Sequence, residues 1–355
     1  MKFNTNIIQQ NVKTISSLDS DFVYFDVSEN KIYLASENQA LKLNIQFEDI
    51  AEDEKVFVIG KADFLHIISF ADEVEIKSDY SFIAGDSKGK FESNPNYLDV
   101  LDSIKIMFSQ SDTYEPIFDV DEENFKLLTR GSIFVRQEDQ RESFQNLNIQ
   151  SGQIFSSSVY RVYINSFPKD VEAIIHANVL KFIFQLGLNT KVLKNKDSFL
   201  LENGDISLYF ASLRNSEFIP ILAEKFQKNV NATYETTKIS FDLEELKKKL
   251  EFISFYAKKN PSGLTYLKID ADNKVTLSVN ESNAVTVECR DITNNESSDE
   301  NFCLPFNSLT MLEIISKLSK GVESIDLYAS RKNELKLFIL SFGENEKVIL
   351  TKINV

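Results

Sequence analysis

The sequence has 355 residues, enough for two or three domains of ordinary size. Its 39 Lys and Arg residues against 54 Asp and Glu give a formal net charge of −15. This balance argues against a protein held on nucleic acid or on an anionic membrane mainly by bulk positive charge. The two cysteines, Cys289 and Cys303, are too few to staple the chain with disulfides, which favours a reducing compartment.

The N-terminal residues 1–17 have no uninterrupted apolar core and no cleavage pattern, so we expect no signal peptide. Apolar stretches such as Val179–Leu188 stop short of the roughly 20 residues that a membrane-spanning helix needs. We therefore expect a cytoplasmic protein.

Helical periodicity recurs three times along the chain, each time near an extended segment. Apolar residues three or four apart predict helices over residues 7–15, 125–135 and 243–253. Asp121 and Asp242 stand where N-caps belong, just before the second and third of these helices. The three patterns recur at intervals of roughly 120 residues, which indicates an internal repeat.

A second helix is predicted roughly 60 residues after each of the first set, again behind a short extended run. Alternation of apolar and polar residues between the helices predicts antiparallel strands with one buried face. The chain is therefore predicted to be α+β, with three repeats that each pack two helices on antiparallel sheet. The predicted repeats are residues 1–112, 113–232 and 233–355, and polar stretches lie near both boundaries. The second helices are expected over residues 64–68, 179–184 and 309–318, and strands over residues 22–25, 31–34, 207–210 and 274–277.

In this arrangement the residues resemble those of the bacterial-type DNA sliding clamp, the DNA polymerase III beta-subunit family. The match covers the whole chain and depends on the order of many weak motifs. It is best in the middle repeat. The matching segments are Met1–Phe3, Lys90–Leu98, Phe125–Leu128, Arg136–Arg141, Ser156–Tyr163, Pro305–Lys320 and Lys347–Val355.

The resemblance implies the clamp fold and a ring-forming homodimer in which two copies associate head to tail around double-stranded DNA. Such a ring is a processivity factor for DNA polymerase and is placed on DNA by a clamp loader. Such a ring is not an enzyme, and the resemblance implies no cofactor and no metal. The missing long loop after the first helix, where Ser17 runs quickly into Phe22, indicates a divergent member and leaves host or phage origin open.

Basic residues on or near the predicted helices are the candidate DNA contacts. From residue pattern alone they suit a solvated polar face. The resemblance instead implies that they face the hole and contact phosphates without sequence specificity. The acidic excess would then lie on the outer sheets. The candidates are Lys13, Lys61, Lys126, Arg130, Arg136, Arg141, Lys181, Lys247, Lys248, Lys249, Lys317 and Lys320.

The resemblance also implies a pocket between the second and third repeats that binds a short hydrophobic peptide from polymerases and loaders. The familiar Asp-Gly-His-Arg is replaced here by Ser158-Val159-Tyr160-Arg161, and the usual C-terminal Met-Pro-Met-Arg-Leu by Thr351–Val355. The groove keeps its apolar character, so we expect an altered specificity. A plain core strand and an ordinary C-terminus fit these residues equally well. The candidates are Ser157, Tyr160, Arg161, Val162, Ile349, Thr351, Ile353 and Val355.

The contact between copies is expected where the third repeat's first helix meets the edge of the first repeat. The candidates are Ile253 and Phe255 on one side and Ile104 and Phe108 on the other. A position in the buried core suits any one of them equally well.

Alternatives from other functional classes have less support. An acidic adaptor of similar fold that binds proteins without enclosing DNA is the second hypothesis, and a hydrolase built on the Asp119–Glu123 acidic cluster is the third. His66 and His176 stand apart in apolar settings, and the cysteines lack the spacing of a zinc site. Residues 270–281 resemble a calcium loop only in part, so we expect a hairpin turn at Asp272-Asn273 instead.

Overall fold

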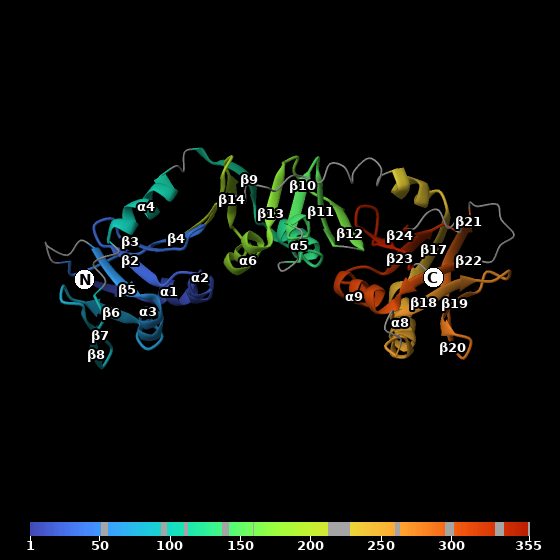
Figure 1. The fold of residues 1–355 in the computed structure, drawn as a ribbon, viewed down its shortest axis with the longest axis horizontal. Coiled ribbons are helices and arrows are strands. Elements are labelled where there is room, and N and C mark those ends of the chain that lie inside the picture. The colour runs from blue at the N-terminus through green and yellow to red at the C-terminus, as the bar shows by residue number, and fades with distance from the viewer. Residues whose placement is uncertain are drawn as a thin grey trace. The chain divides into compact units, whose positions relative to one another are not determined.

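The three-dimensional description rests on a computed structural model of residues 1–355. It describes residues 1–50, 56–93, 98–109, 113–136, 142–158, 160–211, 228–259, 263–294, 302–330 and 337–353. The predicted α+β fold class is confirmed, because helices pack on four antiparallel sheets (Figure 1). No helix in these ranges is long and apolar enough to cross a membrane.

The first part of the described chain twice repeats one pattern, in which a strand and a helical segment precede three further strands. The first copy contains β1 (Lys2–Asn4), α1 (Asn6–Gln10), α2 (Val12–Ser17), β2 (Phe22–Asp26), β3 (Lys31–Ala35) and β4 (Gln39–Asn44). The second contains β5 (Val56–Gly60), α3 (Lys61–Ile68), β6 (Glu73–Ile76), β7 (Ser81–Ala84) and β8 (Ser87–Lys90), and is followed by α4 (Leu98–Ser109).

The middle of the chain repeats the same pattern twice more. The third copy contains β9 (Glu115–Asp119), α5 (Glu122–Ser132), a short 3-10 helix η3 (Glu142–Phe144), β10 (Asn146–Gln150), β11 (Gln153–Ser158) and β12 (Arg161–Ser166). The fourth contains β13 (Ala173–His176), α6 (Ala177–Leu186), β14 (Lys191–Lys194), β15 (Ser198–Asn203) and β16 (Ile206–Ala211). Residues 228–234 then form a helix.

The last part carries the fifth and sixth copies. The fifth contains β17 (Thr237–Asp242), α8 (Leu243–Ala257), β18 (Leu264–Ile269), β19 (Val275–Asn280), β20 (Asn283–Val287) and an additional strand, β21 (Cys289–Asn294). The sixth contains β22 (Phe302–Asn307), α9 (Ser308–Leu318), β23 (Ser324–Ala329), β24 (Leu337–Ser341) and β25 (Lys347–Thr351).

Two compact units divide the chain. Unit 1 comprises Met1–Phe125 and Asn178–Asn215, and unit 2 comprises Lys126–Ala177 and Ser216–Val355. Unit 1 contains a four-stranded sheet, β1-β6-β7-β8, and an eight-stranded sheet, β5-β2-β3-β4-β16-β15-β14-β9. Unit 2 contains a nine-stranded sheet, β13-β10-β11-β12-β25-β24-β23-β17-β21, and a four-stranded sheet, β20-β19-β18-β22.

The long sheets are each built from two four-stranded groups joined through their last strands. In unit 1 the join is β4 with β16, and in unit 2 it is β12 with β25. We call these joins seam 1 and seam 2. The two remaining last strands, β8 and β20, end the four-stranded sheets and have no second strand partner among the described residues. The same group therefore occurs six times, but only four copies are joined in pairs.

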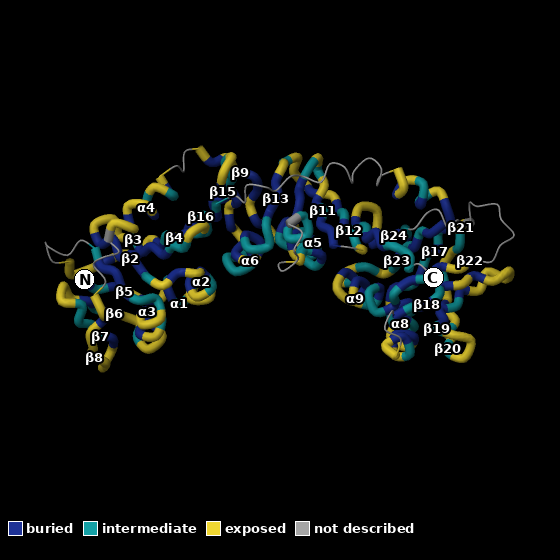
Figure 2. The backbone as a smooth tube through the Cα atoms, viewed as in Figure 1, coloured by how far each residue is buried: buried dark blue, intermediate teal, exposed yellow. Residues whose placement is uncertain are grey.

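Each side of the unit 1 sheet has its own helical cover. Phe25 points toward the α1–α3 side, where its ring packs edge-on against Phe64 at 5.3 Å. Its neighbour Tyr24 points to the opposite side, into a cluster with Ile104 and Phe108 of α4. Figure 1 shows α4 across the sheet from α1 and α3, and Figure 2 shows the sheet strands buried between these layers. The alternation of side chains along a strand accounts for the two cores.

The predicted helices are present with shifted ends. The first is broken at Asn11, whose side-chain amide donates to the carbonyl of Ile7 (2.8 Å) and so ends α1. Asp121 and Asp242 cap α5 and α8, as predicted, by accepting from the backbone N–H of Asn124 (2.7 Å) and Glu245 (3.1 Å). Helix α4 and the helix at residues 228–234 are not among the predicted helices.

Candidate functional site

The predicted DNA contacts fall into two groups according to what their charged atoms contact. Lys61 donates to the carbonyl of Leu18 (2.6 Å), and Lys249 and Lys317 pair with Glu245 (3.2 Å) and Glu313 (2.9 Å) four residues earlier. A second group has no ion pair within the described part of the chain, and Arg141 lies outside that part. The second group comprises Lys13, Lys126, Arg136, Lys181, Lys247, Lys248 and Lys320.

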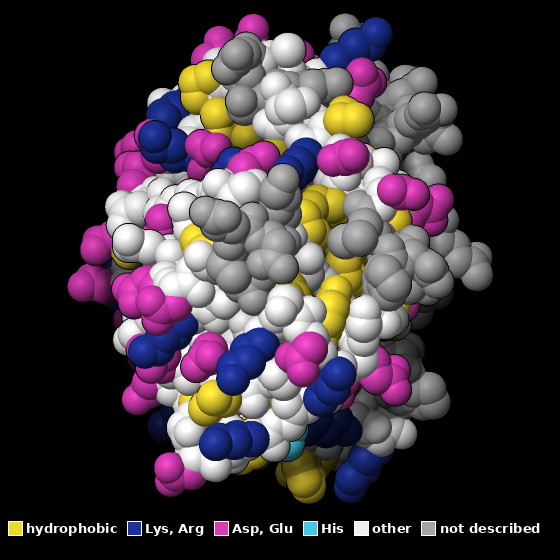
Figure 3. All heavy atoms as spheres, turned by 90° about the vertical axis from the view of Figure 1, so that its left-hand side faces the viewer, with side chains coloured by type: hydrophobic (Ala, Val, Ile, Leu, Met, Phe, Trp, Pro, Cys, Tyr) yellow, Lys and Arg dark blue, Asp and Glu magenta, His cyan; other side chains and the backbone are white. Residues whose placement is uncertain are grey.

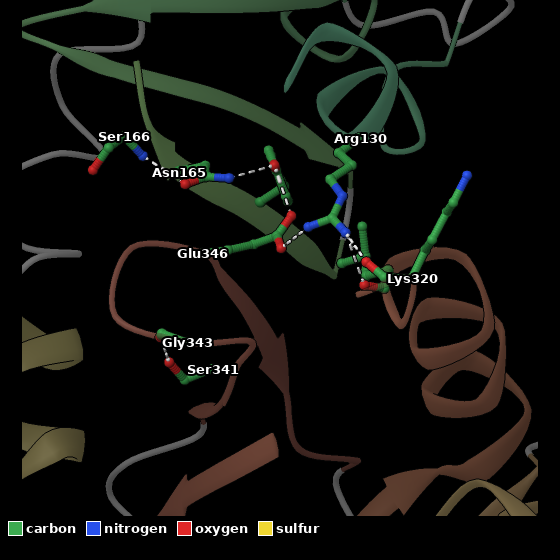
Figure 4. Close-up of polar contacts among 9 residues, drawn as sticks. Arg130, Asn165, Ser166, Lys320, Ser341, Gly343 and Glu346 are labelled. Carbon is green, nitrogen blue, oxygen red and sulfur yellow. Dashed lines mark hydrogen bonds and ion pairs between the residues drawn. The ribbon is translucent and has the colours of Figure 1, made fainter. Parts of the chain in front are cut away.

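Arg130 differs from all of these because its guanidinium is buried in unit 2. It pairs with Glu346 of the β24–β25 turn and donates to the carbonyls of Leu318 (3.2 Å) and Lys320 (2.9 Å) behind α9 (Figure 4). The Tyr163 hydroxyl donates to the other oxygen of Glu346 (3.0 Å). Only 11% of the Arg130 side chain and 6% of the Glu346 side chain are exposed. Arg130 therefore ties α5, and Tyr163 ties β12, to Glu346 of the β24–β25 hairpin.

The charge state of this network is governed by its burial. Burial raises the pKa of Glu346, and the charge of Arg130 and the hydrogen bond from Tyr163 offset part of that rise. Burial likewise raises the pKa of Tyr163, followed in importance by the nearby Glu346 carboxylate. The Tyr163 hydroxyl therefore donates as a neutral group to the Glu346 carboxylate, whose negative charge Arg130 stabilises.

The expected separation of charge between the outer sheets and the helices stays a prediction. The face of the protein in Figure 3 carries Lys and Arg interspersed with Asp and Glu rather than a continuous basic surface. On α8, the lysines at 247–249 are flanked by Glu244, Glu245 and Glu251. The lysines of α8 therefore lie among carboxylates of the same helix rather than in an uninterrupted basic run.

Most of the residues predicted for the peptide pocket lie at or beside seam 2. Val162 on β12 is paired in register with Ile349 on β25, and both lie in one apolar cluster. The backbone N–H of Thr351 donates to the carbonyl of Tyr160 (3.2 Å), whose side chain is 68% exposed. The backbone N–H of Ile353 donates to the carbonyl of Pro305 (3.2 Å), and Ser157 is buried on the neighbouring β11. Val355 lies outside the described residues.

Arg161 belongs to the other face of this sheet. Its guanidinium pairs with Glu313 of α9 at 2.9 Å, as strand alternation requires for a neighbour of Val162. The cluster also contains residues that sequence reasoning missed. The sequence pattern that could have found them is the alternation of apolar and polar residues along β23 and β24 and the spacing of apolar residues within residues 228–234. They are Val230, Tyr234, Tyr328, Leu337, Ile339 and Ile164.

Tyr234 gives this cluster an unusual polar element. Its ring meets that of Tyr328 edge-on at 4.6 Å, and the Lys347 ammonium lies 4.9 Å from the Tyr234 ring centroid. Its hydroxyl is buried without a hydrogen-bond partner in the structure, and burial raises its pKa. This edge-on aromatic pair therefore places a polar hydroxyl inside an otherwise apolar cluster.

Of the side chains predicted at the contact between copies, three are buried within the chain. Ile104 and Phe108 point from α4 into the unit 1 sheet, and Ile253 points from α8 into the core of unit 2. Phe255 is 62% exposed and its neighbour on the same surface, Phe252, is 50% exposed. Of the four predicted contact residues, Phe255 is therefore the exposed one, and the contact itself stays a prediction.

The residues considered for catalysis or metal binding have structural partners. His176 shares a hydrogen bond with Gln145 (2.8 Å), and the His66 ring packs on Phe70 at 4.8 Å. Asp270 accepts from the backbone N–H groups of Asp272 and Lys274, as the predicted hairpin turn requires. No group of three or more potential ligands is placed to hold a metal ion in the described ranges.

Comparison with solved structures identifies the fold. The chain matches the DNA polymerase III subunit beta of Pseudomonas aeruginosa with a TM-score of 0.72, 12% identity and 100% coverage of both chains. It matches the beta chain from Streptococcus pneumoniae with a TM-score of 0.71 at 13% identity, covering 100% of this chain and 99% of that one. The Helicobacter pylori beta clamp bound to a DNA ligase peptide gives 0.67 at 16% identity, with 100% of both chains covered.

The protein therefore has the fold of the bacterial DNA sliding clamps over its whole length. No protein-family model and no curated protein matches the sequence.

Proposed function

We propose that this protein is a DNA sliding clamp, a non-enzymatic processivity factor that encloses duplex DNA and tethers a replicative polymerase and other partners. The observation that carries the proposal is the match to DNA polymerase III beta clamps, which covers 100% of this chain and 99–100% of those chains. A clamp loader is the implied partner for placing the ring on DNA. The free thiols Cys289 and Cys303 fit a cytoplasmic location.

The proposed division into three repeats, residues 1–112, 113–232 and 233–355, is supported by the sixfold strand pattern. Each repeat would hold two copies of the four-stranded group, and each seam would join neighbouring repeats. On this scheme β20 ends the first four-stranded group of its repeat, as β4 and β12 do in theirs. Strand β8 ends the second group of its repeat, as β16 and β25 do in theirs. If β20 in one copy paired with β8 in a second copy, the two copies would be joined in the same way as neighbouring repeats are joined at seams 1 and 2.

Ring closure is therefore proposed to occur head to tail through these two edges. The exposed strand β8 and the end strand β20 offer unpaired backbone groups, which proteins normally cover or pair. Phe252 and Phe255 on α8 would add apolar area beside β20. Two copies with three repeats each would give a homodimeric ring of six.

Topological enclosure is tested with a linear duplex that carries biotin at both ends. The protein is added first, streptavidin then blocks the ends, and free protein is removed by gel filtration in high salt. A ring that has threaded onto the DNA should stay on the blocked duplex and slide off the open one. Equal loss from both would favour the adaptor hypothesis, in which the protein binds partners without enclosing DNA.

The unpaired helix lysines should supply the salt-dependent part of DNA binding. Replacing Lys126 and Lys248 by Ala should lower the slope of log affinity against log salt by about 0.9 for each phosphate that the protein no longer neutralises. Lys317→Ala is the matched control, because its ammonium is already paired with Glu313. An unchanged slope in the double variant, measured on duplexes of unrelated sequence, would remove these residues from the DNA contact.

The groove at seam 2 is proposed to bind a hydrophobic segment of the polymerase. Replacing Tyr160 and Ile353 by Ala should weaken that binding about tenfold or more, since exposed aromatic and aliphatic anchors dominate such contacts. Fluorescence anisotropy of a labelled polymerase peptide measures the change. Phe70→Ala is a suitable control, because Phe70 has an equally exposed side chain, at 69%, in unit 1. Unaltered affinity in the double variant would contradict the assignment.

A further inference from the structure

The sheet β20-β19-β18-β22 of unit 2 is hollowed on the side that faces away from α8. Helix α8 packs on β18, β19 and β20, and the buried cross-strand pair Leu267 and Leu277 points toward it. Because side chains alternate along a strand, the adjacent Lys268 and Thr276 point to the opposite side. There the structure contains a cavity of about 530 Å³, a size typical of small-molecule sites. Its polar lining includes Lys268, Lys274, Thr276, Ser278, Asn280 and Cys303.

The strand register fixes where these side chains stand on the cavity floor. Lys268 on β18 is paired with Thr276 on β19 and with Cys303 on β22. Directly paired residues have side chains that start about 5 Å apart, so these three form one row. Ser278 follows two residues further along β19, on the same face. A β-bulge between Ser278 and Asn280 bends the strand at this end of the cavity.

Several donors of this lining have no partner in the described part of the chain. Ser278 is 6% exposed, and its hydroxyl makes no hydrogen bond there. The ammonium groups of Lys268 and Lys274 make no ion pair with those residues, and that of Lys268 lies 5.7 Å from the Tyr266 ring centroid. Buried polar groups in folded proteins nearly always have a partner. An unpartnered hydroxyl in the wall of a cavity therefore indicates a place for an external hydrogen-bonding group.

The two ends of the cavity differ in charge. Lys268 and Lys274 stand at the β18–β19 turn, whereas Glu281 stands at the β19–β20 turn, roughly 20 Å away along β19. The lysine end also contains Asp270, whose carboxylate already accepts from two backbone N–H groups of the turn. The positive end is thus free to pair with an anion, and the negative end is free to accept hydrogen bonds.

A phosphate monoester fits the lysine end best. It carries roughly −1.5 to −2 charges at neutral pH and three strong acceptor oxygens, which match two ammonium groups and the Thr276 hydroxyl. The rest of the polar lining, Ser278, Asn280 and Glu281, combines hydrogen-bond donors and acceptors and suits the hydroxyl groups of a polyol. Phe302, the aromatic residue of the described lining, is 1% exposed and offers no surface on which a nucleobase could stack.

We propose that this cavity binds a small phosphorylated polyol, with its phosphate group between Lys268 and Lys274 and its hydroxyl groups along β19 toward Ser278. The inference rests on one sheet of unit 2 and goes beyond the proposed clamp function. It therefore stands or falls independently of whether the protein encloses DNA.

Calorimetric titration of the full-length protein with inositol monophosphate tests the site. Lys268→Ala/Lys274→Ala should weaken binding about tenfold or more, because two charge-assisted contacts to the phosphate are lost. Lys258→Ala/Lys259→Ala removes the same charge from exposed positions at the end of α8 and should bind like the wild type. Inorganic phosphate should bind more weakly than the monophosphate. A wild type that does not bind inositol monophosphate, equal affinity of the two lysine variants, or equal affinity for inorganic phosphate would each overturn the proposal.

The two thiols of the wild-type protein locate the ligand without any substitution. Cys303 is exposed in the cavity, whereas Cys289 lies on β21, outside it. Saturating inositol monophosphate should slow the alkylation of Cys303 by iodoacetamide severalfold and leave the rate at Cys289 unchanged, as followed by mass spectrometry of the modified peptides. An unchanged rate at Cys303 would contradict the assignment. Protection of Cys303 by duplex DNA at the same phosphate concentration would show a nucleic-acid contact instead and would equally overturn it.

Discussion

Replacing Phe252 and Phe255 together by Asp is expected to convert the protein to monomers and to abolish its retention on end-blocked duplex DNA. The two rings are exposed on α8, next to the sheet that ends in β20. In the proposed ring they are buried against the second copy, where two carboxylates would be desolvated without partners. Sedimentation velocity should show one species near 40.6 kDa instead of twice that mass.

The control for this experiment is Ile106→Asp. Ile106 is 60% exposed, close to the value for Phe255, but it lies on α4 in unit 1. That variant should stay dimeric and stay on blocked DNA. A Phe252→Asp/Phe255→Asp protein that still dimerises and is still retained would show that copies associate through another surface. If the wild-type protein is monomeric at micromolar concentration, the ring does not close by itself and would need a clamp loader or DNA to hold the two copies together.

The order of helices and strands was accessible from sequence because it depends on local signals. Apolar spacing located the helices, and the short extended runs expected before the second helices correspond to lead strands such as β13. The joins of β4 with β16 and β12 with β25 could not be found in this way. They link segments far apart in the chain, and nothing in the local pattern of Val162 or Ile349 specifies the other as its partner.

The functional roles of single side chains were less accessible. The pair Ile104 and Phe108 was predicted only as a contact between copies, because the sequence alone cannot say whether such an apolar pair faces the chain's own core or a second molecule. The structure places it in the seam 1 cluster. Likewise Arg130 has the position of a surface cation on α5, and its partner Glu346 is 216 residues away. Only the folded chain brings these charges together.

This buried pair should have a large effect on stability. Arg130→Met removes the cation and leaves Glu346 without its partner in a site where only 6% of its side chain is exposed, and we expect a loss of about 3–5 kcal/mol. Denaturation followed by circular dichroism measures the total, and hydrogen exchange of β12 and β25 locates the loss at seam 2. Lys320→Met is the control, because only the backbone carbonyl of Lys320 accepts from Arg130 and its side chain is exposed.

The pH dependence of that variant identifies the cause. Burial raises the pKa of Glu346 above that of the unfolded chain, and the loss of Arg130 removes the charge that opposes this rise. The folded state then binds a proton more tightly than the unfolded state, so the stability of Arg130→Met should increase as the pH falls through the folded pKa toward 4.5. Arg130→Met/Glu346→Gln should recover part of the lost stability at neutral pH and lose this pH dependence. A single variant with the wild-type pH profile would show that Glu346 does not depend on Arg130 for its charge.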